Sequence, residues 1–188
     1  MKIFFSEVFD RDIEVIRWQI KAENVTPSGI VERCEHGYPA IILLNPAPKN
    51  TGERDDTFYK NISNLLWLTC PYLNEKIHGF ENAGYIERIQ NFINNDRLLL
   101  GMMENAHADY FFFRKNIYHH FFGDSCEMDE DSRIFNKGIG GIWNTDNLKC
   151  LHQHYSHYRL CEQNIAGRIV YHMLNGQTFC SGVNCNDA

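Results

Sequence analysis

The spacing of apolar residues predicts a mostly helical chain. Residues 10–22 carry isoleucine, valine and tryptophan at helical intervals, and a Pro-Ser-Gly sequence follows them. Helical patterns also run from residue 71 to about 119, where two glycines and residues 94–96 predict breaks between two or three helices. Two further helices are predicted, one from Thr145 or Asp146 to about residue 162 and one over residues 166–174.

Three short apolar runs predict strands. Residues 29–34 and 40–44 are rich in β-branched side chains and flank a tight connection, which predicts a hairpin. Residues 64–69 predict a short buried strand. Directly after it, Pro71 suits the first position of a helix, with Cys70 as the N-cap. These elements predict an α+β fold in which a small antiparallel sheet, the hairpin plus one strand, packs against about five helices.

Polar segments separate these elements. Residues 45–63 lack a clear period and contain two prolines and a glycine, so they are interpreted as a surface loop or a mobile lid. Residues 124–131 are acidic and predict a turn. A single domain is expected over residues 1–174, followed by a loosely ordered tail over residues 175–188.

Composition narrows the class of protein. The hydrophobic fraction of 44% and the aromatic fraction of 13% are sufficient for a packed core. A net charge of -6 without a basic run argues against general nucleic-acid binding, and no apolar run resembles a membrane span or a secretion signal. The chain is therefore expected to be cytoplasmic and not membrane-bound, with its oligomeric state open. In that reducing compartment its seven cysteines are expected to be thiols or metal ligands.

Four residues are predicted to share a metal site. Cys34 and His36 lie at the tip of the predicted hairpin, where Gly37 lets two nearby side chains point into one space. Cys70, at the start of a helix, faces the positive end of the helix dipole, which favours a thiolate and hence metal binding. Cys150 opens the densest cluster of ligand-type residues in the chain.

If this cluster forms a helix, ligand-type residues lie on one side of it and apolar residues lie on the other. Cys150, His154 and His157 gather on one side, opposite an apolar stripe. His154 and His157 are therefore candidates for proton transfer, and they rival His36 as the fourth metal ligand. His152 falls beside the apolar stripe, which predicts a packed histidine. If the helix instead begins after Cys150, then Cys150 and His152 can chelate a metal together.

A second candidate site suits an anion or a phosphorylated ligand. His107, Tyr110 and Arg114 share one helix face by their spacing. Gly140 and Gly141 belong to a glycine-rich loop whose backbone amides can form an anion-binding nest. The loop lacks the lysine of a P-loop, and the three spaced residues are also typical of a hydrated or interhelical face.

Several motifs resemble those of a known family. They are, in chain order, Arg33-Cys34-Glu35-His36-Gly37-Tyr38-Pro39-Ala40, Trp67-Leu68-Thr69-Cys70-Pro71-Tyr72-Leu73, Gly138-Ile139-Gly140-Gly141 and Lys149-Cys150-Leu151-His152-Gln153-His154-Tyr155. In this order they resemble the bacterial domain of unknown function 501 family, over roughly residues 33–167. Members of that family are often encoded near an exopolyphosphatase, and the resemblance implies no established activity.

Three hypotheses about function follow. The first is a zinc site formed by Cys34, Cys70, Cys150 and one histidine, with further histidines acting on a small-molecule substrate. The second is a [4Fe-4S] cluster held by the same three cysteines, with one iron open to a substrate. The third is a metal-free binding or regulatory module for a phosphorylated ligand or a protein partner. Cys180 and Cys185, in the tail, are interpreted as incidental.

Overall fold

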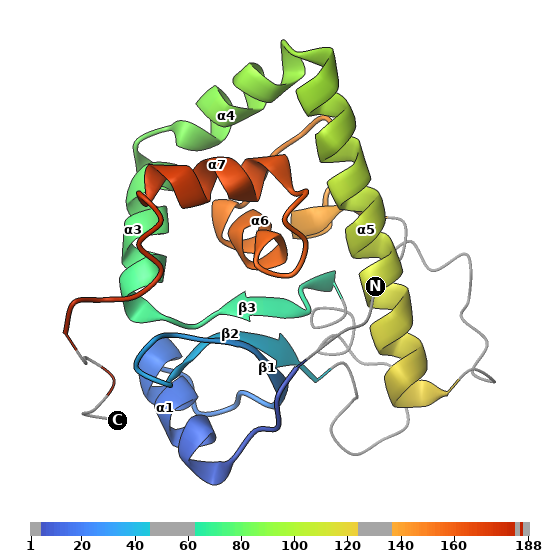
Figure 1. Ribbon diagram of the computed structural model, residues 1–188. Helices are drawn as coiled ribbons and strands as arrows, with labels where there is room; N and C mark the ends of the chain where they lie inside the picture. Colours follow the sequence, from blue (N-terminus) through green and yellow to red (C-terminus); the bar gives the residue numbers. More distant parts are fainter. Residues whose placement is uncertain (1–4, 46–62, 124–136, 183–184, 186–188) are drawn as a thin grey trace.

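The computed structural model describes residues 5–45, 63–123, 137–182 and 185 of the chain. Its sheet is antiparallel: the central strand β2, Pro39–Leu44, pairs with β1, Pro27–Arg33, and with β3, Leu66–Leu68. All of β2 is buried, so both faces of the sheet are covered (Figure 1). The predicted hairpin plus one strand is confirmed. Most of the predicted loop over 45–63 and the predicted acidic turn lie outside the described residues.

Helix α1, Asp10–Ile20, covers one face of the sheet. Its Ile16 packs against Ile42 of β2 in a small core cluster. At the start of the helix, Asp12 forms an ion pair with Arg33 at 2.7 Å, which ties α1 to the end of β1. The helix predicted over residues 10–22 is therefore confirmed, and it forms a layer of its own below the sheet in Figure 1.

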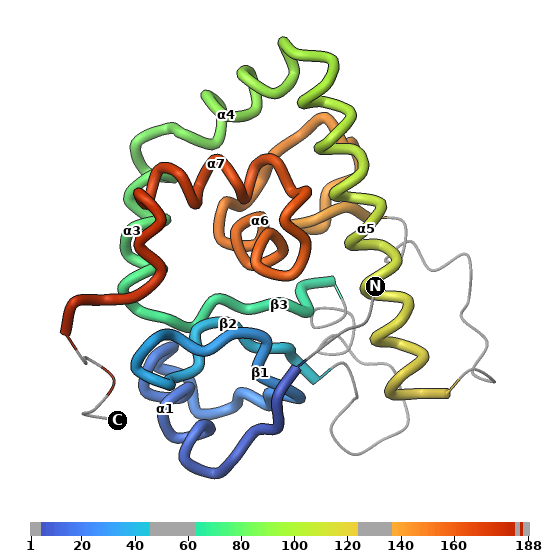
Figure 2. The backbone as a smooth tube through the Cα atoms, viewed as in Figure 1, coloured from blue at the N-terminus to red at the C-terminus, as the bar shows by residue number. Residues whose placement is uncertain are grey.

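The other face of the sheet meets a group of helices. Their bounds are α3 Pro71–Asn82, α4 Tyr85–Asn94, α5 Arg97–Phe122, α6 Leu151–Tyr158 and α7 Ile165–Met173. Figures 1 and 2 show α6 surrounded by the other four, with α7 lying across it. Helix α3 continues through Gly79, where a break was predicted. The mostly helical α+β fold is confirmed, with six α-helices in the described ranges.

Helix α6 is shorter than predicted at its N-terminal end. The backbone N–H of Leu148 donates to Gln90 Oε1 at 2.9 Å, and that of Leu151 donates to Glu81 Oε1 at 2.7 Å. Side chains of α3 and α4 thus satisfy these amides and hold the preceding residues outside the helix. The helix begins at Leu151, and Cys150 is its N-cap in an extended conformation.

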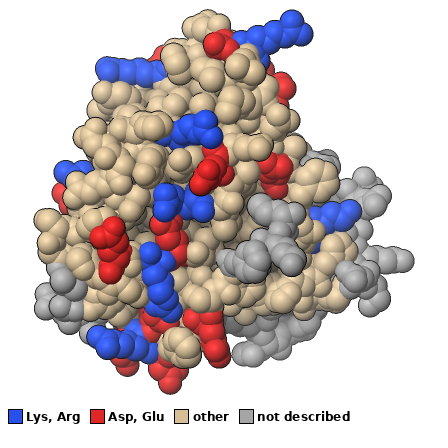
Figure 3. Space-filling model, in the orientation of Figure 1, with Lys and Arg blue, Asp and Glu red and all other residues tan. Residues whose placement is uncertain are grey.

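The surface carries charges of both signs. On the face shown in Figure 3, basic and acidic side chains lie next to one another. Within the described ranges, no helix is both long enough and apolar enough to cross a membrane.

The tail also has described structure. After α7 the chain runs past α3 towards α1 (Figures 1 and 2). Within the predicted tail, Cys185 is 8% exposed, and its sulfur accepts a hydrogen bond from Gln19 of α1 at 3.3 Å. Cys185 is therefore in contact with the folded domain.

Candidate functional site

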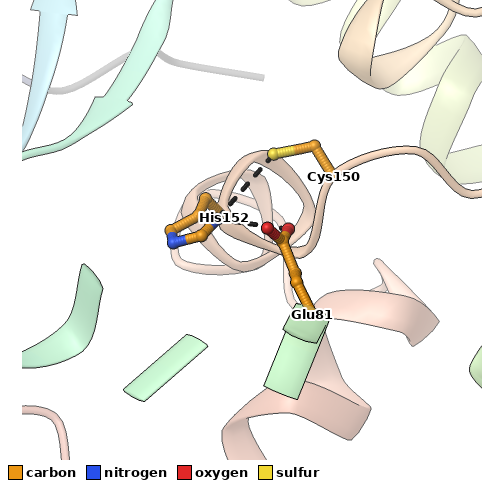
Figure 4. A group of neighbouring side chains, drawn as sticks. All are labelled: Glu81, Cys150 and His152. Carbon is orange, nitrogen blue, oxygen red and sulfur yellow. Dashed lines mark hydrogen bonds and ion pairs between the residues drawn. The ribbon is translucent and has the colours of Figure 1, made fainter. Parts of the chain in front are cut away.

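Glu81, Cys150 and His152 form a cluster that we call the α6 cluster (Figure 4). Among the described residues it is the one group of three or more His, Cys, Asp or Glu whose ligand atoms all lie within 4.8 Å of one another. Glu81 comes from the last turn of α3, and the other two come from the start of α6. The helix begins after Cys150. This is the helix start for which the sequence predicted that Cys150 and His152 can chelate a metal together.

The orientation of His152 is set by its ring nitrogens. Its Nε2 lies 3.2 Å from the carbonyl oxygen of Asn74, and because a carbonyl only accepts hydrogen bonds, Nε2 carries a proton. Its Nδ1 lies 3.2 Å from Glu81 Oε1 and 4.0 Å from Cys150 Sγ. A neutral ring would place the Nδ1 lone pair against a carboxylate oxygen, which is repulsive. The space between the three side chains therefore favours a positive charge, either a second ring proton or a metal ion.

The charges of the α6 cluster stabilise one another. Burial lowers the pKa of His152, but the hydrogen bonds and charges of Cys150 and Glu81 outweigh it and raise the pKa to about 10. Burial raises the pKa of Glu81, and the contact with His152 and the Leu151 amide outweigh it, so the net pKa lies below the ordinary value. Near neutral pH the cluster thus combines an ionised carboxylate with a cationic centre.

A pocket of about 570 Å³ lies beside the cluster, and Cys150 and His152 belong to its lining. The polar part of the lining is dominated by side-chain amides, including Asn64 and Gln153, which are hydrogen-bonded to each other. Trp67 of β3 adds an indole that is 41% exposed. The described lining contains no lysine or arginine, and the positive charge of His152 is balanced by the carboxylate of Glu81, so the pocket suits an uncharged polar molecule better than a phosphate.

The other predicted metal ligands lie apart from this cluster. His36 is exposed at the hairpin tip, as predicted, and Cys34 packs against the core cluster that contains Cys70. With Cys150 they do not form a group whose ligand atoms lie within 4.8 Å. Cys70 is the N-cap of α3, as predicted. Burial nevertheless outweighs the neighbouring amides and raises the pKa of its thiol to about 11, so the predicted thiolate is not favoured.

His154 and His157, predicted for proton transfer, are fully buried and do not line the pocket. The side chain of Asn164 lies between them, 3.2 Å from His154 Nδ1 and 3.0 Å from His157 Nδ1. Burial and the nearby His107 lower the pKa of both rings to about 3, so both are neutral. Their position on one side of α6 is explained by ring contacts with His107 and Tyr110 of α5 and by the hydrogen bonds to Asn164, and a role in proton transfer stays a prediction.

The residues of the predicted anion site do come together, but in the interior. His107 is 3% exposed and Arg114 is fully buried. His107 Nδ1 accepts a backbone N–H of the glycine loop at 3.0 Å, and Arg114 donates to the backbone carbonyl just before the loop. Gly140 and Gly141 have φ values of 78° and 71°, which favour glycine. The two side chains thus clamp the loop against α5, and a role in ligand binding stays a prediction.

Glu81 was not predicted as a site residue. A single carboxylate in the last turn of a helix carries no motif, and its partners follow about seventy positions later in the chain. Its spacing of seven from Asn74 places both residues on one face of α3. The shared helix face was the one sequence signal that could have pointed to Glu81. Such spacings are too common in helices to identify a site.

The fold and the α6 cluster together define a mostly helical α+β protein with a carboxylate, a thiol and an imidazole grouped beside a pocket. The chain belongs to the family described as Protein of unknown function (DUF501), whose model matches residues 30–172 of the 188. The predicted resemblance is therefore confirmed, and the matched region includes the whole α6 cluster. Comparisons with curated proteins and with solved structures found no match.

Proposed function

We propose that this protein is a metal-dependent enzyme in which the α6 cluster holds a zinc ion at the edge of the pocket. The observation that carries the proposal is the convergence of a carboxylate, a thiol and an imidazole nitrogen within 4.8 Å. Zinc accepts all three donor types. The contact between His152 Nε2 and the Asn74 carbonyl is also the outer hydrogen bond that a metal-binding histidine usually makes.

The lining of the pocket supports a catalytic role and a class of substrate. Zinc held by three side chains keeps a position for water or substrate and activates water near neutral pH. Because Cys150 and His152 belong to the pocket lining, we infer that this position faces the pocket. The amides of Asn64 and Gln153 can bind an uncharged substrate, and the ring of Trp67 can cover its flat face. The proposed reaction is hydrolysis of an uncharged, amide-like molecule.

A metal-free thiol enzyme is the second candidate, because Cys150 Sγ lies 4.0 Å from His152 Nδ1. In a catalytic triad, however, the nucleophile and the carboxylate contact opposite nitrogens of the histidine ring. Here Cys150 and Glu81 both approach Nδ1. This shared approach favours a metal ion over a proton relay.

Zinc analysis of the purified full chain tests the proposed site. We expect Cys150→Ser and Glu81→Gln each to lose about one equivalent of zinc relative to the wild type, because a ligand is removed. Cys161→Ser is the matched control, since Cys161 is a partly buried cysteine in the connection after α6 and is outside the cluster. Equal zinc content in the wild type and in Cys150→Ser would contradict the metal site. Rapid alkylation of Cys150 in a metal-free protein would then favour the thiol enzyme.

The cobalt-substituted protein tests the open position and the substrate class. We expect acetohydroxamate, an amide-like ligand that binds a metal through both of its oxygens as an anion, to shift the visible absorption of bound cobalt, and inorganic phosphate to leave it unchanged. A shift with phosphate alone would instead favour a phosphorylated ligand, which the sequence had suggested. A spectrum insensitive to both ligands would contradict an open catalytic site.

A further inference from the structure

Two cysteines lie near the start of β2, where the tail reaches the sheet. Gln19 of α1 donates through Nε2 to the Pro39 carbonyl at 2.8 Å and to Cys185 Sγ at 3.3 Å. One residue further along β2, the Ala40 carbonyl accepts the backbone N–H of Cys70 at 3.3 Å. The start of β2 therefore anchors both Cys185 and Cys70, although they are far apart in the sequence.

Two further cysteines lie around the same point. The backbone N–H of Cys34 donates to the Tyr38 carbonyl at 2.9 Å, which places Cys34 beside the start of β2. His36 Nε2 lies 3.0 Å from the carbonyl oxygen of Cys180, and its ring contacts Phe179 edge-to-face. These contacts hold the tail against the hairpin tip. Cys34 lies on the hairpin side of this contact, and Cys180 lies on the tail side.

We call Cys34, Cys70, Cys180 and Cys185 the tail thiol group. Four residues separate Cys180 from Cys185, which is within the spacing of paired cysteine ligands in structural zinc sites. Cys70 and Cys185 are buried, at 6% and 8% exposure, and the other two are partly buried. Burial is the main cause of the raised pKa values of Cys70 and Cys185, and neighbouring cysteines of the group raise them further. The thiols are thus close enough to raise one another's pKa. None of the four members carries a positive charge that would stabilise a thiolate.

We propose that the tail thiol group binds a structural zinc ion that fastens the tail to the hairpin. Zinc in a four-thiolate site replaces the thiol protons, which pass to solvent, and no oxidant or reductant is needed. In the described residues the four sulfur atoms do not form a group within 4.8 Å. Binding therefore requires the four thiols to turn towards a common centre. This inference does not depend on the α6 cluster.

The zinc content of single variants of the full, reduced chain separates the two sites. We expect Cys185→Ser and Cys180→Ser each to lose about one equivalent of zinc relative to the wild type. Cys150→Ser is expected to keep this zinc, and Cys161→Ser to keep the content of the wild type. Unchanged zinc in both tail variants would overturn the tail site, whatever the result for Cys150→Ser. Loss in Cys150→Ser alone would thus support the proposed enzyme and reject the tail site.

Alkylation of the wild-type chain provides a measurement that needs no variant to fold. We expect added zinc to slow the reaction of Cys180 and Cys185 with iodoacetamide by about ten-fold or more, and a chelator to restore it, because bound thiolates are shielded. Cys161 should react equally in both conditions. Equal rates for the tail cysteines with and without zinc would overturn the proposal. So would a disulfide within the group, or iron with sulfide in place of zinc, in freshly purified protein.

Discussion

At the scale of single residues, Asn164 determines the state of two buried histidines. Its Oδ1 accepts the backbone N–H of Gly167 at 3.0 Å, which identifies that atom as the oxygen. His154 Nδ1 must then donate to Oδ1, and the Asn164 amide must donate to His157 Nδ1. A single side chain thus makes Nδ1 the donor in His154 and the acceptor in His157, and a second proton on His157 would break its hydrogen bond.

This arrangement predicts that the protein loses stability as the pH falls. The folded-state pKa is lowered to about 3 for His157 and about 4 for His107, from 6.5, so below pH 6.5 the unfolded chain binds protons that the fold excludes. We expect the free energy of unfolding to decrease from about pH 6.5 to about pH 4.5, with about 1.4 kcal/mol per pH unit for each such histidine at the lower end. Urea denaturation with a chelator present, over a series of pH values, measures this slope.

The contribution of His157 can be isolated by substitution. His157→Gln keeps a polar side chain but removes the titrating ring, so the slope should become shallower. His78→Gln changes an exposed histidine of α3 and should keep the wild-type slope. If His157→Gln and the wild type had the same slope over this pH range, the buried ring would not be the cause.

The sequence predicted the candidate site only in part, and residue contacts explain why. Cys150 was predicted because ligand-type residues are dense around it. Which histidine joins it depends on where α6 begins, and that is decided by Glu81 and Gln90, which bind backbone amides just before and at the helix start. These contacts come from distant positions in the chain. Local periodicity therefore favoured His154 and His157, whereas the structure brings His152 to Cys150.

At the scale of secondary-structure elements, α6 and α7 pack closely at Gly167. A Cβ atom added there would lie 2.2 Å from the His154 carbonyl oxygen and 2.4 Å from Tyr158 Cβ. The obstructing atoms belong to the backbone and to a Cβ, so neither can move without shifting α6. Gly167 thus sets the distance between the two helices that enclose the buried histidines.

We expect Gly167→Ala to lower the free energy of unfolding by about 2 to 3 kcal/mol, because it overpacks this contact. The matched control is Gly79→Ala in α3, where an added Cβ meets nothing within 4 Å. There the change should raise stability by about 0.5 to 1 kcal/mol, since alanine favours a helix. Chemical denaturation of both variants checks the opposite signs. A Gly167→Ala protein as stable as the wild type would show that the helices can separate without cost.

The elements themselves were predicted well where the pattern is local. The hairpin, the strand before Cys70 and the helix beginning at Pro71 follow from β-branched runs and from proline at a helix start. The predicted break at Gly79 is wrong because one glycine costs a helix interior only about 1 kcal/mol, which the buried Leu73 and Ile77 of α3 offset. Tertiary packing thus decided the boundaries that local signals left ambiguous.

At the scale of the whole molecule, β2 joins two layers. Its Ile42 packs with α1, whereas Ile41 packs in the core cluster of the helices on the other side. Glu32 of β1 also binds Arg159, at the end of α6, with both carboxylate oxygens, the shortest distance being 2.7 Å. Among the described residues neither layer has a sheet of its own, so the folding of each depends on the same strand.

The shared strand predicts that the chain unfolds as one cooperative unit, as expected for a single domain over residues 1–174. We expect the urea transitions followed by far-UV circular dichroism and by tryptophan fluorescence to superimpose, because the two layers cannot separate without exposing β2. A variant with Trp67→Phe and Trp143→Phe leaves Trp18 as a reporter of α1 alone. Its fluorescence should change at the same urea concentration as the helical signal, since loss of α1 uncovers Ile42. An earlier transition for Trp18 would instead mean that α1 detaches first and that the helices and the sheet form the stable core.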